Sequence, residues 1–267
     1  MATDNAVEPV NIMLSRDELL LVLGLINAEY IPGLDADPLG ELSTDQLVLA
    51  LTVAGRGLRA RGLARVRETG ELAVHAALLA AVSACAYSQN AVFVYHWPAK
   101  SETPTRYFGH LREGAFVAHT RPEDVLHLFT VLPSKDRLIE QVLAVCQYQD
   151  VPAAKTGPVQ ISGQDFARMR ELAEKGDLEQ AIGILAAGQA PPGAAERLVE
   201  TLAGGLRLSI VQTLKQLGDG SVLKRDFTLV QNEQQAWLVI AKTDDTATLL
   251  AEPATRVELR TILSESL

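Results

Sequence analysis

The order of predicted elements along the chain repeats in its two halves, which limits the folds that it can adopt. Each half begins with a short strand, Val10–Leu14 and Val159–Ile161, followed by a helix and then a second helix. A strand meander and a proline-started helix close each half, at Pro122 and at Pro253. The short sequence periods of solenoid repeats are absent. The shared order therefore predicts a duplicated α+β unit.

Residues around the two prolines favour the same duplication. At their offset of 131 residues (253 − 122), Leu126 lies opposite Val257. Tyr107 and Trp237 occupy matching places on the preceding strands, one residue off that offset. Each meander has one apolar face that must be covered, and two meanders that pair edge to edge hide exposed edges. We predict an α+β fold whose two pseudo-symmetric halves share a central antiparallel sheet flanked by helical bundles.

A proline- and glycine-containing segment divides the halves. Gln149–Pro158 contains two prolines and one glycine in ten residues and lies near the midpoint of the 267-residue chain. Such composition is typical of a linker. The sequence therefore predicts an N-terminal α+β half over residues 1–148, a linker over 149–158 and a C-terminal α+β half over 159–267.

Capping signals and spacing predict the elements. Ser15–Glu18 and Ser43–Gln46 have the capping-box form and predict helices that follow them, the second over 44–62. Leu63–Val74 predicts a β-hairpin. Acidic residues directly after Pro122 predict a helix there, since the first turn favours both features. Apolar residues at helical spacing predict one long helix over Pro191–Leu214.

Composition excludes several protein classes. Apolar residues make up 48% and charged residues 21%, as in globular proteins. Two cysteines exclude a disulfide scaffold, and Cys85 and Cys146 lie in apolar helical contexts that predict burial. The N-terminus lacks the form of a signal peptide, and the most apolar windows, Leu19–Ile26 and Ala73–Ala86, are too short to span a bilayer. We expect a soluble, cytoplasmic protein without a membrane span.

No residue pattern identifies a reaction. The five histidines form neither an HExxH motif nor a Cys–His pair at ligand spacing, although His110 and His119 could face each other across a hairpin. The GxSxG, Walker A and strand-following GxGxxG patterns are absent. The sequence therefore predicts a protein that is not an enzyme, with no catalytic residues, no cofactor and no metal.

Five arginines within twelve residues form the densest group of charge: Arg56, Arg59, Arg61, Arg65 and Arg67. Together with the helix 44–62 and the hairpin 63–74, they are similar to a winged-helix segment that binds DNA. A solvated helix face, with arginine stems over apolar surface, explains them as well. The net charge of −9 argues against nucleic acid as a partner. A winged-helix-containing DNA-binding regulator is therefore the alternative function.

Three segments resemble the EspG family of type VII (ESX) secretion chaperones. They are Leu14–Leu19 with Ile31–Leu34, the strand entry Tyr107 with its counterpart Trp237, and the closing strand, proline and helix over Leu249–Leu263. The resemblance implies a quasi-two-fold α+β fold with a central antiparallel sheet flanked by helical bundles. It also implies a cytoplasmic binding protein that keeps a secreted helical partner soluble by burying its apolar tip in a groove beside the sheet.

The resemblance also implies where a partner would bind. The places are the loop Pro98–Thr105 and two hairpin turns, which contain Arg112 and Glu113 in one and Thr243, Asp244 and Asp245 in the other. We therefore predict a non-catalytic protein-binding protein, a chaperone for a type VII secretion substrate. Besides the winged-helix regulator, a structural subunit of a bacterial assembly is a further alternative.

Overall fold

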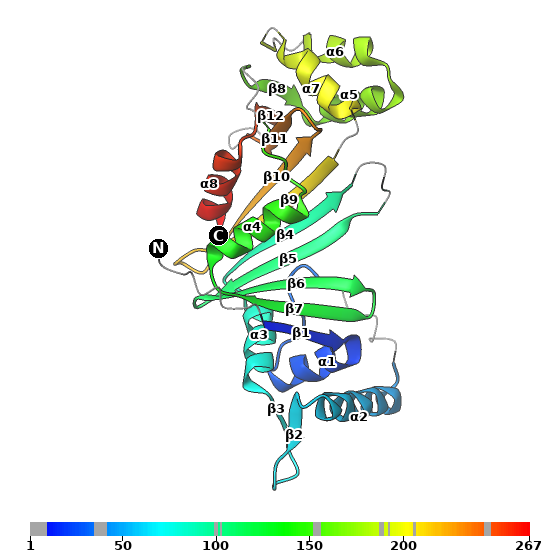
Figure 1. Ribbon diagram of the computed structural model, residues 1–267, viewed down its shortest axis with the longest axis vertical. Coiled ribbons are helices and arrows are strands. Elements are labelled where there is room, and N and C mark those ends of the chain that lie inside the picture. Colours follow the sequence, from blue (N-terminus) through cyan, green and yellow to red (C-terminus); the bar gives the residue numbers. More distant parts are fainter. Residues whose placement is uncertain are drawn as a thin grey trace, which may run out of the picture. The chain divides into compact units, whose positions relative to one another are not determined.

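The computed structural model describes residues 10–34, 42–98, 101, 103–151, 156–186, 190–191, 193–204, 207–242 and 247–267. Over these residues the chain forms an α+β fold built on a ten-stranded antiparallel sheet, as predicted (Figure 1). The strand order is β1-β7-β6-β5-β4-β9-β10-β11-β12-β8, and β2 and β3 form a separate hairpin.

The elements follow one another along the chain in two series. The first series is β1 (Val10–Ser15), α1 (Arg16–Leu25), α2 (Thr44–Ala60), β2 (Ala64–Val66), β3 (Leu72–Val74), α3 (Ala76–Ala86), β4 (Asn90–Trp97), β5 (Thr105–Arg112), β6 (Ala115–Glu123), β7 (Leu126–Leu132) and α4 (Lys135–Val145). The second series is β8 (Val159–Ser162), α5 (Gly163–Lys175), α6 (Leu178–Ala186), α7 (Ala194–Ala203), β9 (Arg207–Gln216), β10 (Val222–Gln231), β11 (Ala236–Ala241), β12 (Thr248–Pro253) and α8 (Arg256–Ser266).

The strand order confirms the predicted duplication. From one end the sheet begins β1-β7-β6-β5-β4, and from the other end it begins β8-β12-β11-β10-β9. In each series the first strand therefore pairs antiparallel with the last strand of its own meander, β1 with β7 and β8 with β12. A helix follows each meander, α4 in one series and α8 in the other.

The residue offset proposed for the duplication is wrong. Pro122 lies in β6, and the segment predicted as a helix after it is the strand β7. Buried and partly buried side chains alternate at the start of β7, and β7 pairs with both β1 and β6. The helix equivalent to α8 is α4, so Leu126 and Val257 belong to different kinds of element. Tyr107 on β5 and Trp237 on β11 are not equivalent either, since β5 corresponds to β10.

The long helix predicted over Pro191–Leu214 is also wrong. Helix α7 ends at Ala203, and β9 begins at Arg207. At Gly204 the backbone N–H donates to the carbonyl of Glu200, and a Cβ there would lie 2.9 Å from that oxygen. Residues four apart share one face of a helix but also one face of a strand, which explains the misassignment.

The chain packs as two compact units, 1–92 with 107–138 and 93–106 with 139–267. In the first unit, α1 and α3 pack on β1, β6 and β7 around a core that includes Leu14, Val22, Val82, Val117 and Phe129. Ser15 begins α1 as predicted, since its hydroxyl accepts from the Glu18 N–H and the Glu18 carboxylate accepts from the Ser15 N–H. These contacts hold α1 at the end of β1.

The second unit has its own core. Helices α5, α6 and α7 pack on one another, and their apolar residues share a core with β8, β10, β11 and β12. The indole of Trp237 is fully buried there and donates to the hydroxyl of Thr201, 3.1 Å away. In the same unit Glu140 on α4 forms ion pairs with Arg256 and Arg260 on α8.

Candidate partner-binding surfaces

Two of the predicted partner-binding residues lie where β5 meets the following turn: Arg112 is the last residue of β5, and Glu113 is the first residue of the turn. Glu113 and Gly114 both adopt left-handed backbone conformations, with φ of 49° and 80°. The guanidinium of Arg112 donates to the hydroxyl of Ser83, 3.1 Å away, and lies 5.2 Å from the ring centre of Tyr87. Arg112 therefore fastens the turn to the end of α3, while the Glu113 side chain remains 72% exposed.

The other predicted partner-binding residues fall elsewhere. Thr243, Asp244 and Asp245 lie outside the described residues, as do positions 99, 100 and 102 of the loop Pro98–Thr105. Their part in partner binding stays a prediction.

The five clustered arginines do not form one basic face. Arg61 donates to the carboxylate of Glu18 at 2.6 Å and to the backbone carbonyl of Met13 at 2.8 Å. It therefore ties the end of α2 to α1 and β1 within the first unit. Arg67 lies 3.6 Å from the carboxylate of Glu71 in the exposed β2–β3 hairpin. Two of the five guanidinium groups thus already have carboxylate partners.

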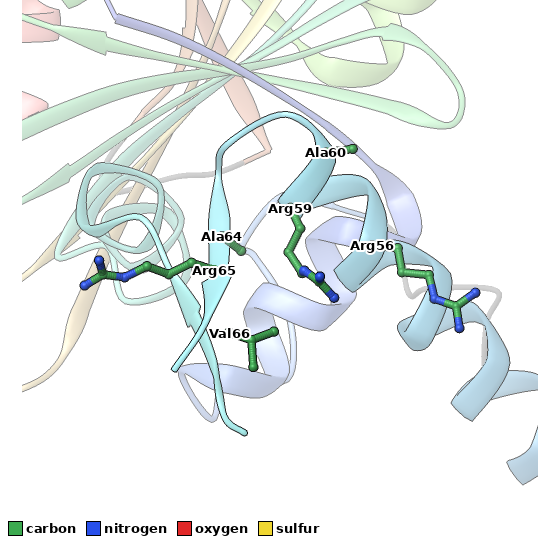
Figure 2. Close-up of a pocket in the computed structure, with 6 residues that line it drawn as sticks. All are labelled: Arg56, Arg59, Ala60, Ala64, Arg65 and Val66. Atoms are coloured by element: carbon green, nitrogen blue, oxygen red, sulfur yellow. The ribbon is translucent and has the colours of Figure 1, made fainter. Parts of the chain in front are cut away.

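The remaining three arginines line a hollow of about 730 Å³ with Ala60, Ala64 and Val66. Figure 2 shows Arg59 extending between α2 and β2, Arg56 extending away from the hairpin, and Arg65 on the opposite side of β2. The position of Arg65 follows from its place on β2, because neighbouring side chains of a strand point to opposite faces and those of Ala64 and Val66 flank it. DNA binding by the cluster stays a hypothesis, and the expected single basic surface is divided.

The outer face of α2 carries apolar side chains that the sequence patterns did not identify as a surface. Val48, Leu49 and Val53 are 59%, 65% and 54% exposed. On the inner face Ala54 and Leu58 are buried. The run Leu47–Leu51 is apolar throughout and would have indicated a helix with apolar residues on more than one face. Sequence alone predicts burial for such residues, so only the structure reveals their exposure.

Three buried histidines lie on neighbouring strands of the first unit. His119 Nε2 is 3.0 Å from His127 Nδ1, and the His119 ring stacks on Phe129 with ring centres 4.5 Å apart. His110 lies on β5, and its ring centre is 6.4 Å from that of His119 on β6. The two histidines are therefore close to each other across the hairpin, as the sequence suggested. Burial lowers the pKa of His110 to about 3 and also lowers the pKa of His119. His110 and His119 are therefore neutral core groups, and His127 is buried beside them.

Other reactive groups are also enclosed. Cys85 and Cys146 are buried, as predicted, and burial raises the pKa of both thiols, that of Cys146 to about 11. The part of the chain that the structure describes contains no group of three or more His, Cys, Asp or Glu side chains arranged to hold a metal ion. No helix within the described ranges combines the length and apolar character needed to cross a bilayer.

Comparison with known proteins gives a structural match. No family model matches the chain, and no curated protein is significantly similar to it in sequence. Among solved structures, the chain is similar to the Mycobacterium tuberculosis type VII secretion system chaperone EspG5, which was solved in complex with a PE25–PPE41 dimer. The TM-score is 0.69 at 13% sequence identity, over 96% of this chain and 95% of that chain. The chain therefore has the EspG-like fold that its sequence motifs predict.

Proposed function

We propose that this protein is a non-catalytic cytoplasmic chaperone that binds a type VII secretion substrate. The observation that supports this most is the structural match to EspG5, because it extends over nearly the whole of both chains. A likeness of that extent covers both series of elements and the ten-stranded sheet, whereas a shared small motif would cover one part only. The partner is then a secreted helical protein, in keeping with the PE25–PPE41 dimer bound by the matched chaperone.

The chemistry of the described residues favours binding over catalysis. A general base must be able to reach a substrate proton, whereas the histidines of β5, β6 and β7 are buried, and burial lowers the pKa of His110 and His119. A nucleophilic cysteine needs a low pKa, whereas burial raises the pKa of both thiols. These groups therefore support packing in the core.

For partner contact we propose the β5–β6 turn and the segment that contains Thr243, Asp244 and Asp245. At the first turn Arg112 would hold the backbone against α3 and Glu113 would meet the partner, since its carboxylate, 3.6 Å from the Arg112 guanidinium, is the more exposed of the two groups. Glu113→Lys should weaken binding to the native partner while leaving the fold unchanged. The matched control is Glu68→Lys, an equally acidic exposed position in the β2–β3 turn.

The function is tested by isolating the tagged chain from its own cells and identifying what is bound to it. We expect a stoichiometric secreted protein or protein pair of helical composition. Co-expression with that partner should then raise the fraction of the partner found in solution. Recovery of nucleic acid without a stoichiometric protein, or a partner whose solubility does not depend on the chain, would contradict the proposal.

A further inference from the structure

The outer face of α2 has two distinct parts along its length. Leu49, Val53, Arg56 and Ala60 are spaced at i, i+4, i+7 and i+11, which places them on one face of the helix. All four are exposed, and Leu49 and Val53 are more than half exposed. The first part of the face is therefore apolar, and the second part is basic. Large apolar side chains that gather on a surface commonly mark an interaction site.

The basic part continues into the hollow beside the β2–β3 hairpin. Arg59 extends between α2 and β2, next to the small side chains of Ala60 and Ala64 (Figure 2). Val66, on the hairpin side of the hollow, is 48% exposed. Arg56 and Arg59 form no ion pair with any residue that the structure describes. The surface thus offers apolar contact, two available guanidinium groups and room for an approaching backbone.

We propose that the outer face of α2, together with β2, is a docking surface for an acidic amphipathic helix of a partner protein. Leu49 and Val53 would contact two apolar side chains one turn apart on that helix. Arg56 lies seven residues beyond Leu49, which is about 10 Å along the axis. The partner helix therefore carries two carboxylates about two turns from its apolar pair, opposite Arg56 and Arg59. This surface is independent of the proposed secretion function.

Charge complementarity decides the occupant. Guanidinium groups pair well with carboxylates, and a helix laid into a groove buries apolar residues at these spacings. A nucleic acid would place phosphates beside Leu49 and Val53 without burying them, whereas an amphipathic helix covers both side chains. In a symmetric dimer whose two-fold axis lay near Arg56 and Arg59, these arginines would approach the same two arginines of the second copy. Repulsion between the guanidinium groups would disfavour that dimer.

The test uses two fluorescein-labelled helical peptides of about 20 residues, with Ala, Gln and Lys at the remaining positions. Each carries a leucine pair one turn apart and a glutamate pair two turns away, in opposite orders so that both helix directions are covered. Fluorescence anisotropy with the full chain should give a dissociation constant in the micromolar range for one of them. Leu49→Ser with Val53→Ser, and Arg56→Glu with Arg59→Glu, should each weaken that binding about tenfold or more.

Matched controls and a charge exchange make the result specific. Val257→Ser removes an exposed apolar side chain on α8, and Arg225→Glu reverses an exposed arginine on β10. Both should bind the peptide as the native chain does. A peptide with lysines in place of its glutamates should bind the Arg56→Glu, Arg59→Glu chain better than it binds the native chain.

Three kinds of result would overturn the proposal. One is the absence of peptide binding to the native chain at about 100 μM, or equal binding by the native chain and the α2 variants. Another is a dimer in light scattering that Leu49→Ser with Val53→Ser dissociates, since the face would then bind a second copy. The third is duplex DNA binding that competes with the peptide and is lost with Arg56→Glu and Arg59→Glu.

Discussion

Acidification should destabilise the protein through His110. This side chain is fully buried on β5, its Nδ1 is 3.4 Å from the hydroxyl of Ser88, and burial lowers its pKa from 6.5 to about 3. The folded chain therefore keeps the imidazole neutral, whereas the unfolded chain protonates it below pH 6.5. The contribution of His110 to the free energy of unfolding is then constant above that pH and falls as the pH drops from 6.5 toward 3.

The size of the effect follows from the shift. At about pH 5 the unfolded chain gains roughly 2 kcal/mol from protonating this group, since each pH interval of one corresponds to about 1.4 kcal/mol. Other charges face the same site. His119 is also buried with a lowered pKa, and His110, His127 and Arg121 all oppose its protonation. The native chain should therefore lose more than the contribution of His110 alone.

The measurement compares urea unfolding of the native chain and of His110→Leu at about pH 7.5 and about pH 5, followed by far-UV circular dichroism. The loss of unfolding free energy on acidification should be smaller in the variant by roughly 2 kcal/mol. Hydrogen exchange of peptides from β5, β6 and β7 at both pH values assigns the loss to the first unit. If the variant and the native chain lose the same free energy, His110 is not coupled to folding and the reasoning fails.

Three further tests, the first two with a matched control variant, concern a close packing contact, an ion pair and a buried hydrogen bond. Gly109→Ala would place a Cβ 2.8 Å from two core side chains and should destabilise by about 1–3 kcal/mol in urea unfolding, while Gly218→Ala, with open space around it, should be near neutral. Arg61→Ala leaves the carboxylate of a buried glutamate without its cation and should cost about 1–2 kcal/mol, whereas Arg67→Ala, whose ion pair is exposed, should change stability by less than about 0.5 kcal/mol. Thr201→Val removes the acceptor of the buried indole N–H and should lower the unfolding free energy by about 1–2 kcal/mol.

Local signals predicted most elements of the fold. Both predicted capping boxes form, at Ser15 and at Ser43, because each needs only residues within one helical turn. The duplicated order was also readable, since it depends on the succession of elements rather than on their exact bounds. The failures lie where two structures share one pattern: the residues after Pro122 resemble a helix start, yet the alternation in Leu126–Leu132 gives the strand β7.

The candidate surfaces depend on contacts that no sequence window contains. Arg61 meets a carboxylate 43 residues away, so its separation from the other clustered arginines could not be predicted. Leu49 and Val53 have the character of core residues, and only the packing of α2 through its opposite face leaves them exposed. The fold thus decides which of these side chains are exposed and unpaired on the surface, whereas a local stretch of sequence indicates only their chemical type.

The bond from Arg61 to the carbonyl of Met13 bears on how the protein behaves when concentrated. Met13 lies on β1, which pairs with a single strand, β7, among the residues that the structure describes, and such an edge strand is a template for pairing with another molecule. The guanidinium occupies one of the backbone acceptors that an incoming strand would need. The residue that anchors α2 therefore also takes up one of the backbone groups through which another molecule could extend the sheet at β1.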